Sequence, residues 1–339
     1  MIKEAILQLF DDKDLNPEQM QEVMQEILSG KVNTSQLSAF LVLLRKKGET
    51  AQELFSATEV LLRFCKRINI TDKDKEAILD TCGTGGDNQS TFNISTAVAF
   101  VASAVGVKVA KHGNRAISST CGSADILEHL GIDIHMNERR IKKALKEIGI
   151  AFLFAPDFHP AMKYALPVRK ELGIRTIFNL IGPLSNPVNI THQLLGVYEK
   201  RWLMIMGEVL KKLGRVHAMV VFSSEGLDEI SINEKTYVVE LKDNKIRTYT
   251  LNPKDFGFYY SKNKHPSGKD PATNARILMD VFKGKRGIYR DVVLLNSGAA
   301  IYVADKTDSI QEGIKLAKRA IDEGLVLKKF NLLREFSKS

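Results

Sequence analysis

Apolar residues in the first 70 positions recur at intervals of three and four, as they do on one face of an α-helix. Asn16-Pro17 supplies an N-cap followed by proline at the first helical position, and Thr50-Ala-Gln-Glu53 has the form of a capping box. Gly30 and Gly48 mark the ends of two helices. The pattern predicts an all-helical unit whose apolar faces form a core or a subunit interface. The three stripes are Met20, Val23, Met24 and Ile27; Leu37, Phe40, Leu41 and Leu44; and Leu54, Val60, Leu61 and Phe64.

From about residue 74 the pattern changes, and short apolar runs alternate with segments of helical spacing. This alternation is typical of βα units around a mainly parallel sheet. Two further apolar runs, at 237–241 and 245–250, flank Asp243-Asn244 and predict an antiparallel hairpin at one side of the sheet. The chain is helical again from Asn274. The predicted strands are 77–79, 107–110, 151–154 and 218–222, and the helices between them include 96–105, 126–130, 141–148 and 202–213.

These patterns predict an α/β protein in two unequal lobes. Residues 1–70 form a small all-helical N-terminal lobe, and residues 71–339 form a large α/β lobe with a mainly parallel central sheet flanked by helices. The segment His159–Asn186 is mostly helical up to Leu172 and then rich in Gly, Pro and Asn, so we expect it to cross between the lobes. A chain of 339 residues is long enough to bury a sizeable core in such an arrangement.

Composition limits the class of protein and the cellular compartment to be expected. With 44% hydrophobic and 26% charged residues, the chain is ordinary for a globular protein, and no apolar run is long enough to span a membrane. Met1-Ile-Lys-Glu-Ala5 has no apolar signal core, so we do not expect secretion. The three cysteines form no Cys-x-x-Cys pair, which argues against a disulfide framework or a zinc site and fits a reducing cytoplasm. We interpret Cys82 and Cys121 as small buried fillers.

The net charge of +9 raises the question of nucleic acid. The charge is dispersed and has little aromatic interleaving, and basic residues alternate with glutamate along helices such as 139–147. We therefore interpret most of it as solvated helix faces. A positive field would also steer a polyanionic small substrate.

The segment Asp80-Thr-Cys-Gly-Thr-Gly-Gly-Asp87 follows a predicted strand and precedes a helix that begins near Ser95. Three glycines let the backbone turn tightly and approach a ligand closely. Together with the N–H groups of the next helix they predict a cradle for phosphate. The segment lacks the Gly-Lys-Ser/Thr of a P-loop and is not Gly-x-Gly-x-x-Gly. A plain strand–turn–helix junction is the alternative.

A second loop of this kind follows the strand at 107–110. Lys111-His-Gly-Asn-Arg-Ala-Ile-Ser-Ser119 leads through Cys121-Gly-Ser-Ala-Asp125 into a predicted helix. Loops that follow parallel strands meet at the carboxyl edge of the sheet, where open α/β sheets bind ligands. Lys111 and Arg115 would then be fixed positive charges that face the ligand, although either residue alone would more often be a solvated surface charge.

Together these motifs resemble the anthranilate phosphoribosyltransferases of tryptophan biosynthesis, and they occur in that family's order over most of the chain. The resemblance implies a two-lobe fold in which part of 160–190 joins the helical lobe, and a homodimer formed through that lobe. It also implies transfer of the 5-phosphoribosyl group from 5-phosphoribosyl 1-diphosphate to the amine of anthranilate, the second step from chorismate to tryptophan. The matching segments are Gly83-Thr-Gly-Gly-Asp87, Lys111-His-Gly-Asn-Arg115, His159-Pro-Ala-Met-Lys163 with Arg169, Arg175-Thr-Ile-Phe-Asn-Leu-Ile-Gly-Pro-Leu-Ser-Asn-Pro187, and Glu225-Gly-Leu-Asp-Glu229.

The resemblance also implies how the donor is held. Adjacent acids are usually solvated surface groups, but in the matched motif Asp228 and Glu229, with the Ser95 hydroxyl, are implied ligands of Mg²⁺, with two ions per subunit. Mg²⁺ prefers oxygen ligands and substrate phosphates. The implied donor-binding residues are Gly83, Gly86, Asp87, Thr91, Asn93, Ser95, Thr96, Lys111, Ser119 and Ser123.

On the acceptor side, Arg169 is implied to meet the anthranilate carboxylate as a fork, and Gly182-Pro183 to offer a flat apolar wall. His159 has an alternative role as a cap of the helix after Pro160, and Arg169 as a surface charge. We assign no general base, because an arylamine is already neutral near pH 7. The implied anthranilate-binding residues are Gly83, His112, Asn114, His159, Arg169, Gly182 and Pro183.

Two other functions compete with this one. A pyrimidine nucleoside phosphorylase has the same architecture and a glycine-rich phosphate loop, but it needs no acidic Mg²⁺ clamp. A nucleic-acid-binding relative of the same fold has only the net charge of +9 in its favour. The intact motifs favour a transferase with small-molecule substrates and without nucleic-acid or membrane partners.

Overall fold

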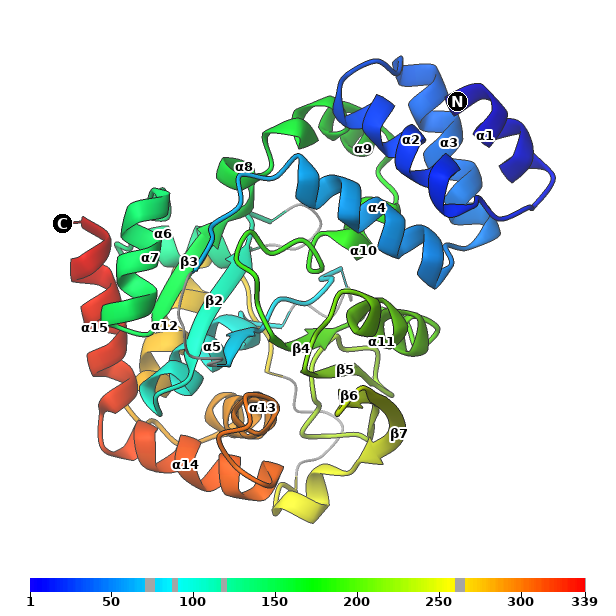
Figure 1. Ribbon diagram of the computed structural model, residues 1–339. Coiled ribbons are helices and arrows are strands. Elements are labelled where there is room, and N and C mark those ends of the chain that lie inside the picture. Colours follow the sequence, from blue (N-terminus) through cyan, green and yellow to red (C-terminus); the bar gives the residue numbers. More distant parts are fainter. Residues whose placement is uncertain (71–76, 87–90, 117–120, 260–265, 339) are drawn as a thin grey trace.

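The computed structural model describes residues 1–70, 77–86, 91–116, 121–259 and 266–338. Its N-terminal part is a bundle of four helices, namely the three that the apolar stripes predict and a first helix that they do not (Figure 1). Asn16 and Thr50 close capping boxes with Gln19 and Glu53 and so begin the second and fourth helices. The third ends at Gly48, whose φ of 91° favours glycine. The four helices are α1 (Ile2–Phe10), α2 (Pro17–Leu28), α3 (Thr34–Lys47) and α4 (Ala51–Arg63).

The crossing segment and the four residues before it supply four more short helices. They follow β3 (Ile150–Phe154) and run from the α/β lobe up to the bundle (Figure 1). The 3-10 helix η1 packs on α2, while α9 packs on α3 and α10 packs on α3 and α4. The wall that faces the α/β lobe is therefore built partly from residues far along the chain. These helices are α8 (Ala155–Phe158), η1 (Pro160–Tyr164), α9 (Leu166–Leu172) and α10 (Ile177–Ile181).

A seven-stranded sheet in the order β3-β2-β1-β4-β5-β6-β7 forms the centre of the large lobe. The first five strands in this order are parallel, and β6 and β7 form the predicted antiparallel hairpin around Asp243 and Asn244, both with positive φ. The sheet is therefore mainly parallel, as predicted. The strands are β1 (Ile78–Asp80), β2 (Lys108–Gly113), β3, β4 (His192–Gly196), β5 (His217–Ser223), β6 (Thr236–Lys242) and β7 (Lys245–Leu251).

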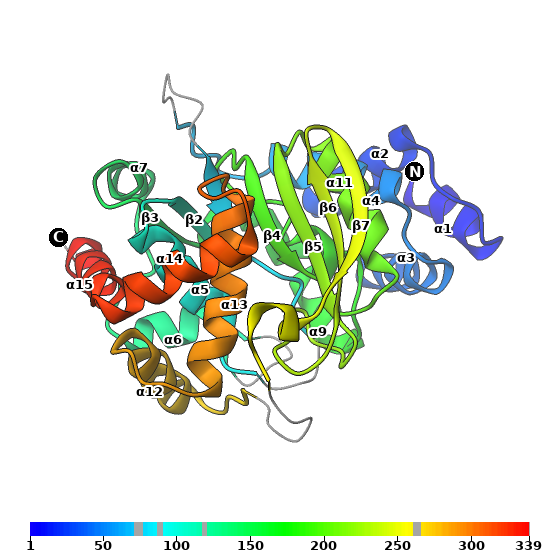
Figure 2. The same cartoon turned by 90° about the horizontal axis from the view of Figure 1, so that it is seen from below.

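Helices cover both faces of this sheet (Figures 1 and 2). On one face, α5 (Ile94–Ala104) packs on α13 (Ile288–Val303) and α15 (Leu325–Lys338). On the other, α11 (Trp202–Lys212) packs on β5, β6 and α4, so the bundle and this side of the sheet share one hydrophobic core. A second core lies under α5 and α13. The remaining elements are α6 (Ser123–His129), α7 (Glu138–Glu147), η2 (Pro253–Phe256), α12 (Pro271–Phe282) and α14 (Ile310–Asp322).

Candidate active site

The glycine-rich loop leaves the sheet where the order of the strands reverses. The chain builds outward from β1 to β3 on one side and from β4 to β5 on the other, so β1 and β4 flank a topological switch point. The N–H of Thr84 donates to Gly196 O at the end of β4, at 2.9 Å. Gly85 and Gly86 have φ of 61° and 75°, a region that glycine enters without strain. The loop therefore runs over the carboxyl edge of the sheet, as predicted.

Helix α5 begins beside this loop and leaves its first turn open. Its N-cap residue, Asn93, makes no side-chain capping bond. The Asn93 amide instead donates to Cys121 O at 3.1 Å and accepts from Asn274 Nδ2 at 3.2 Å, and so bridges to the second loop. The first N–H groups of a helix have no partner within the helix. They give this end of α5 the character of an anion site.

Lys111 lies in β2 and is 4% exposed. Its ammonium donates to Thr81 O at 3.2 Å, to Thr81 Oγ1 at 3.4 Å and to Ser95 Oγ at 3.2 Å. The charge is thus held between the end of β1 and the start of α5. A phosphate on the glycine-rich loop would meet a fixed cation instead of a mobile surface lysine.

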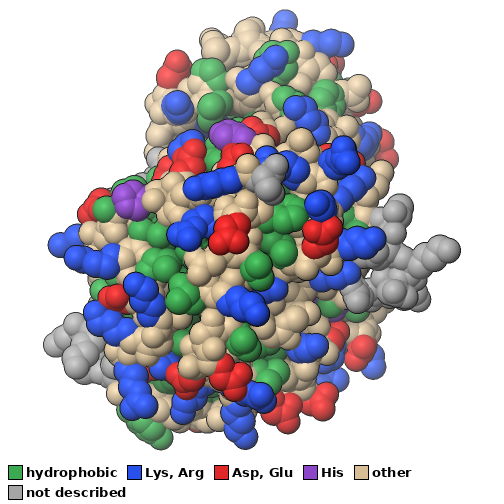
Figure 3. Space-filling model, turned by 90° about the vertical axis from the view of Figure 1, so that its left-hand side faces the viewer, with side chains coloured by type: hydrophobic (Ala, Val, Ile, Leu, Met, Phe, Trp, Pro, Cys, Tyr) green, Lys and Arg blue, Asp and Glu red, His purple; other side chains and the backbone are tan. Residues whose placement is uncertain are grey.

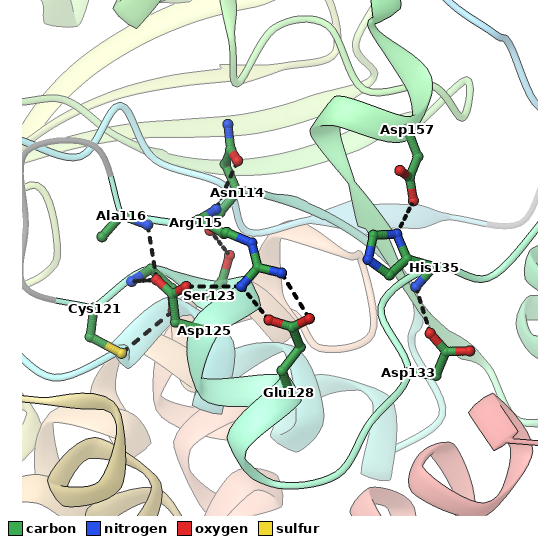
Figure 4. Close-up of polar contacts among 11 residues, drawn as sticks. Asn114, Arg115, Ala116, Cys121, Ser123, Asp125, Glu128, Asp133, His135 and Asp157 are labelled. Carbon is green, nitrogen blue, oxygen red and sulfur yellow. Dashed lines mark hydrogen bonds and ion pairs between the residues drawn. The ribbon is translucent and has the colours of Figure 1, made fainter. Parts of the chain in front are cut away.

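The second loop is closed at its base by one carboxylate (Figure 4). Asp125 Oδ2 accepts the N–H of Ala116 at 2.9 Å and that of Gly122 at 2.8 Å. Asn114 O accepts the N–H of Ala124 at 3.1 Å, beside Ser123. A Cβ on Gly122 would lie 2.5 Å from Asn114 O, so the two ends of the loop approach too closely for any other residue.

Arg115 lines the cleft, as predicted, but its guanidinium is also held by carboxylates. Both terminal nitrogens of its guanidinium contact Glu128, and Nη1 lies 3.4 Å from Asp125 Oδ1 (Figure 4). Its charge is therefore partnered by two carboxylates of α6 and braces the loop.

The predicted site residues converge on one cleft of about 750 Å³ between the bundle and the α/β lobe. Thr96 is the exception, because it is 1% exposed in α5 and does not line the cleft. Asp87 and Ser119 lie outside the described residues. The predicted residues that line the cleft are Gly83, Gly86, Thr91, Asn93, Ser95, Lys111, His112, Asn114, Ser123, His159, Arg169, Gly182, Pro183, Asp228 and Glu229.

The carboxylate pair lies against the glycine-rich loop. Asp228 Oδ2 accepts the Gly85 N–H at 2.8 Å, and Asp228, Glu229 and Ser95 line one recess at the side of the cleft. In the described ranges no three His, Cys, Asp or Glu side chains converge as a ready metal site. Mg²⁺ usually takes one or two carboxylates and completes its shell with water and substrate phosphates. The donor set fits such an ion.

Two histidines form the opposite part of the cleft, with ring centres 5.3 Å apart. Burial lowers the pKa of His159 to about 4 and that of His112 well below its ordinary value. Both rings are therefore neutral near pH 7. In the part of the chain that is described, His112 Nδ1 and Nε2 and His159 Nδ1 are buried without a hydrogen-bond partner. His159 makes no capping bond to η1, which removes the alternative role considered for it.

Arg169 on α9 lines the same part of the cleft, with its guanidinium 5.5 Å from the centre of the Phe178 ring. Burial lowers its pKa to about 10, so the group is still charged near pH 7. Among the described residues it has no ion pair. A half-buried guanidinium without a carboxylate is suited to an anionic ligand.

Sequence reasoning did not assign a role to Asp80 and Asn186. Asp80 is fully buried, and burial raises its pKa to about 6 against the effects of Lys111 and of a 2.8 Å bond from Asn186 Nδ2. Asn186 also donates to Ala110 O at 2.8 Å and so ties β1 to β2 beneath both loops. Asn186 stands inside a matched motif, and Asp80 begins the glycine-rich segment that leads into one, which was the available signal. Burial also raises the pKa of Cys82 to about 12 and of Cys121 to about 11, which disfavours thiolates.

The fold and the cleft define a glycosyltransferase of two domains. Residues 3–65 match the glycosyl transferase family, helical bundle domain, and residues 75–327 match the glycosyl transferase family, a/b domain.

Individual relatives narrow this class. The anthranilate phosphoribosyltransferase of Alkaliphilus metalliredigens (strain QYMF) is 45% identical over 337 residues, 99% of this chain and 98% of the relative. The solved structure of the Thermus thermophilus enzyme has a TM-score of 0.92 and 37% identity and covers 99% of both chains. The Saccharomyces cerevisiae enzyme in complex with PRPP and Mg has a TM-score of 0.89 and 29% identity over 99% of this chain and 98% of that one. This chain belongs to the anthranilate phosphoribosyltransferase family, which confirms the resemblance.

Proposed function

We propose that the protein transfers the 5-phosphoribosyl group from 5-phosphoribosyl 1-diphosphate to the amine of anthranilate, the second step of tryptophan biosynthesis from chorismate. The products are N-(5-phosphoribosyl)anthranilate and diphosphate. One observation carries the proposal: a phosphate cradle with two carboxylates and a half-buried guanidinium without a carboxylate face the same cleft. The transfer reaction needs a site for the polyanionic donor and a site for the anthranilate carboxylate, on either side of the transferred ribose.

The donor would lie along the glycine-rich loop and the open turn of α5. Backbone N–H groups there, with Lys111 and Ser123, suit phosphate oxygens. Asp228, Glu229 and the Ser95 hydroxyl would hold Mg²⁺, for which we propose two ions per subunit. When bound, Mg²⁺ neutralises charge on the leaving diphosphate.

The acceptor would lie against Arg169 and the two histidines. The Arg169 fork suits the anthranilate carboxylate, and Asn114 can bond its amine or carboxylate. Gly182 and Pro183 line the cleft as an apolar wall. Neutral His112 and His159 can accept a hydrogen bond from the arylamine, which protonated rings could not do. No general base is required, since the amine attacks in its neutral form and its proton leaves after the C–N bond forms. The rate then comes from positioning and charge stabilisation.

We also propose a homodimer joined through the bundle. Leu7 and Phe10 on α1 are 68% and 70% exposed, and Val42 on the adjoining α3 is 41% exposed. Exposed apolar groups gathered on neighbouring helices mark an interaction surface. Light scattering of the intact protein and of Phe10→Asp tests this, with a dimer expected for the first and a monomer for the second. A monomeric wild type would contradict it.

A cytoplasmic location is proposed from the three unpaired cysteines. No helix in the described ranges has both the length and the apolar character to cross a bilayer. On the face drawn in Figure 3, Lys and Arg side chains are spread among acidic ones, in keeping with solvated helix faces. We therefore propose small-molecule substrates as the only ligands, without nucleic acid or membranes.

The decisive experiment follows anthranilate fluorescence during incubation with 5-phosphoribosyl 1-diphosphate, with Mg²⁺ and with a chelator. We expect the signal to fall only when donor and Mg²⁺ are both present. A folded sample that never consumes anthranilate would overturn the proposal. Release of base from a nucleoside with free phosphate would then indicate the phosphorylase, and salt-sensitive DNA binding the nucleic-acid-binding relative.

A further inference from the structure

Three arginines from separate parts of the chain surround Glu199, just after β4. Arg45 on α3 of the bundle donates from Nη2 to Glu199 Oε1 at 3.3 Å. Arg175, just before α10, places Nη1 3.6 Å from the same oxygen, and Arg201, at the start of α11, places Nε 2.8 Å from Oε2. One carboxylate thus joins the bundle, the crossing segment and the α/β lobe.

The same arginine, Arg175, also contacts the glycine-rich loop. Its Nη2 donates to the backbone carbonyl of Gly86, and its guanidinium carbon lies 4.3 Å from the centre of the Tyr198 ring. Tyr198 is fastened on both sides, because its N–H donates to Thr84 Oγ1 at 3.1 Å and its hydroxyl accepts from Arg45 Nη1 at 2.9 Å. The loop is therefore connected to the bundle through Tyr198 and Glu199.

Charge and exposure indicate what this cluster is for. The side chains of Arg45, Arg175 and Glu199 are 24%, 27% and 35% exposed, so each ion pair is partly screened by water. Pairs of this kind contribute about 0–1 kcal/mol to stability. Glu49 is also near: it is buried, burial raises its pKa, and Arg45 and Arg201 act against that rise. Three guanidiniums against two carboxylates leave positive charge beside the loop.

We propose that Arg175 is a positioning residue of the donor loop, held by Glu199 and tied to the bundle through Arg45. By binding the Gly86 carbonyl, Arg175 draws a carbonyl dipole away from the polyanion and fixes the end of a loop whose Thr84 and Gly85 N–H groups are already held by Gly196 and Asp228. A guanidinium is suited to this task because it makes both contacts from one rigid plane. The inference rests on the proposed function and adds a residue that touches neither substrate.

The chain contains its own reporter of this cluster. Trp202 is the only tryptophan, is 1% exposed, and lies with its ring centre 6.2 Å from that of Tyr198. The Arg201 guanidinium carbon is 4.6 Å from the centre of the Trp202 ring. A donor that fastens the loop will therefore change the surroundings of Trp202, and its fluorescence can be followed without anthranilate.

The test titrates 5-phosphoribosyl 1-diphosphate with Mg²⁺ into full-length wild type, Arg175→Met, Arg175→Lys and Glu199→Gln. The matched control is Arg139→Met, an exposed arginine on α7. For Arg175→Met we expect KM and Kd for the donor to rise about tenfold, the range of one charge-assisted hydrogen bond. We expect kcat and the KM of anthranilate to stay near wild type, and the Trp202 response to require about tenfold more donor. Arg175→Lys and Glu199→Gln should shift the donor KM in the same direction by less.

A wild-type donor KM in both Arg175→Met and Glu199→Gln would overturn the inference while the transferase stands. A wild type that neither binds the donor nor consumes anthranilate would overturn the proposed function instead. If Arg175→Met fails to fold, Arg175→Lys and Glu199→Gln decide. A Tm that falls without a change in the donor KM would mean a merely structural cluster.

Discussion

Asp228 Oδ2 accepts a hydrogen bond from the Gly85 backbone N–H at 2.8 Å, although the two residues are 143 positions apart. The carboxylate proposed for Mg²⁺ is thus fastened to the loop proposed for the donor. One loop after β5 and one after β1 meet at the switch point, so the ion and the diphosphate would share a single corner of the cleft.

The double variant Asp228→Asn with Glu229→Gln should abolish Mg²⁺-dependent turnover and leave the fold intact. Neutral amides keep the shape of the side chains but attract a divalent cation far less. The measurement is anthranilate consumption across a Mg²⁺ titration, with circular dichroism to check the fold. Asp243→Asn in the β6–β7 turn is the matched control, because its positive φ suits asparagine equally well. Near-normal activity in the double variant would refute the metal assignment.

Gly196→Ala should disrupt the proposed Mg²⁺ site by displacing the backbone of Asp228. A Cβ on Gly196 would lie 1.5 Å from Asp228 O, so the backbone that carries the carboxylates must move. We expect a raised Mg²⁺ requirement and lower kcat, with a loss of stability of about 1–3 kcal/mol, as is usual for overpacking. Gly173→Ala supplies the control: it has φ of 61° but open space around it, so it tests backbone strain without a clash. Equal activity of the two variants would contradict the prediction.

Rules about helix caps and turns predicted the elements whose sequence signals lie within a few neighbouring residues. The caps at Asn16 and Thr50 and the turn at Asp243-Asn244 predicted two helix starts and the hairpin, because each depends on a few neighbouring residues. Strand β4 was not predicted: His192–Gly196 is short, and it becomes a strand by lying between β1 and β5.

The loops of the site could be predicted from the sequence, but the burial and pairing of its side chains could not. Strand-loop-helix order placed both glycine loops at one edge, as the structure confirms. The burial of Thr96 depends on how α5 turns against α13, and the pairing of Arg115 with Glu128 depends on where α6 packs. Such facts arise from tertiary contacts that no local spacing encodes.

Asp125→Ala should weaken donor binding through the second loop. Asp125 Oδ2 holds the N–H groups of Ala116 and Gly122 together, so its loss frees both ends of the loop that carries Asn114 and Ser123. We expect the donor KM to rise about tenfold or more, the effect of losing hydrogen bonds to a charged group. Steady-state kinetics measures this, with Asp157→Asn as control, since Asp157 pairs with exposed His135 outside the loop (Figure 4). An unchanged donor KM would disprove the role.

Arg169→Gln should act on the other substrate. Removing the guanidinium leaves the anthranilate carboxylate without its fork, and we expect the KM of anthranilate to rise about 10- to 100-fold. The donor Kd, measured without acceptor, should stay at the wild-type value. Arg286→Gln, an exposed arginine between α12 and α13, is the matched control. A rise in the donor Kd of similar size would mean that Arg169 contacts the donor instead of anthranilate.

The last prediction concerns stability at the amino ends of the parallel strands, on the side of the sheet away from the cleft. His217 begins β5 and is fully buried, with Nδ1 2.8 Å from Asp305 Oδ1 and Nε2 2.8 Å from Glu240 Oε1. The ring thus bridges the two carboxylates across the amino end of β5. Asp305 also faces His192 at 3.1 Å and Lys242 at 3.3 Å. Burial alone would raise the pKa of Asp305 and of Glu240, but bonds from His217, together with those from His192 to Asp305 and from Tyr302 to Glu240, hold both pKa values below the usual range.

A depressed carboxyl pKa adds stability above the unfolded pKa, near 4, and that stability is lost as pH falls through the folded value. His217→Gln should therefore lower the free energy of unfolding at pH 7 by about 3 kcal/mol, the lower end for breaking a buried pair, because Asp305 is 42% exposed. Between pH 5 and pH 3 the variant should lose less stability than wild type, so the two urea midpoints converge. Activity at 25 °C should persist, because the amino ends of the parallel strands lie away from the cleft. His135→Gln, which removes an exposed pair, is the control. Parallel midpoint curves for His217→Gln and wild type would refute a stabilising bridge through His217.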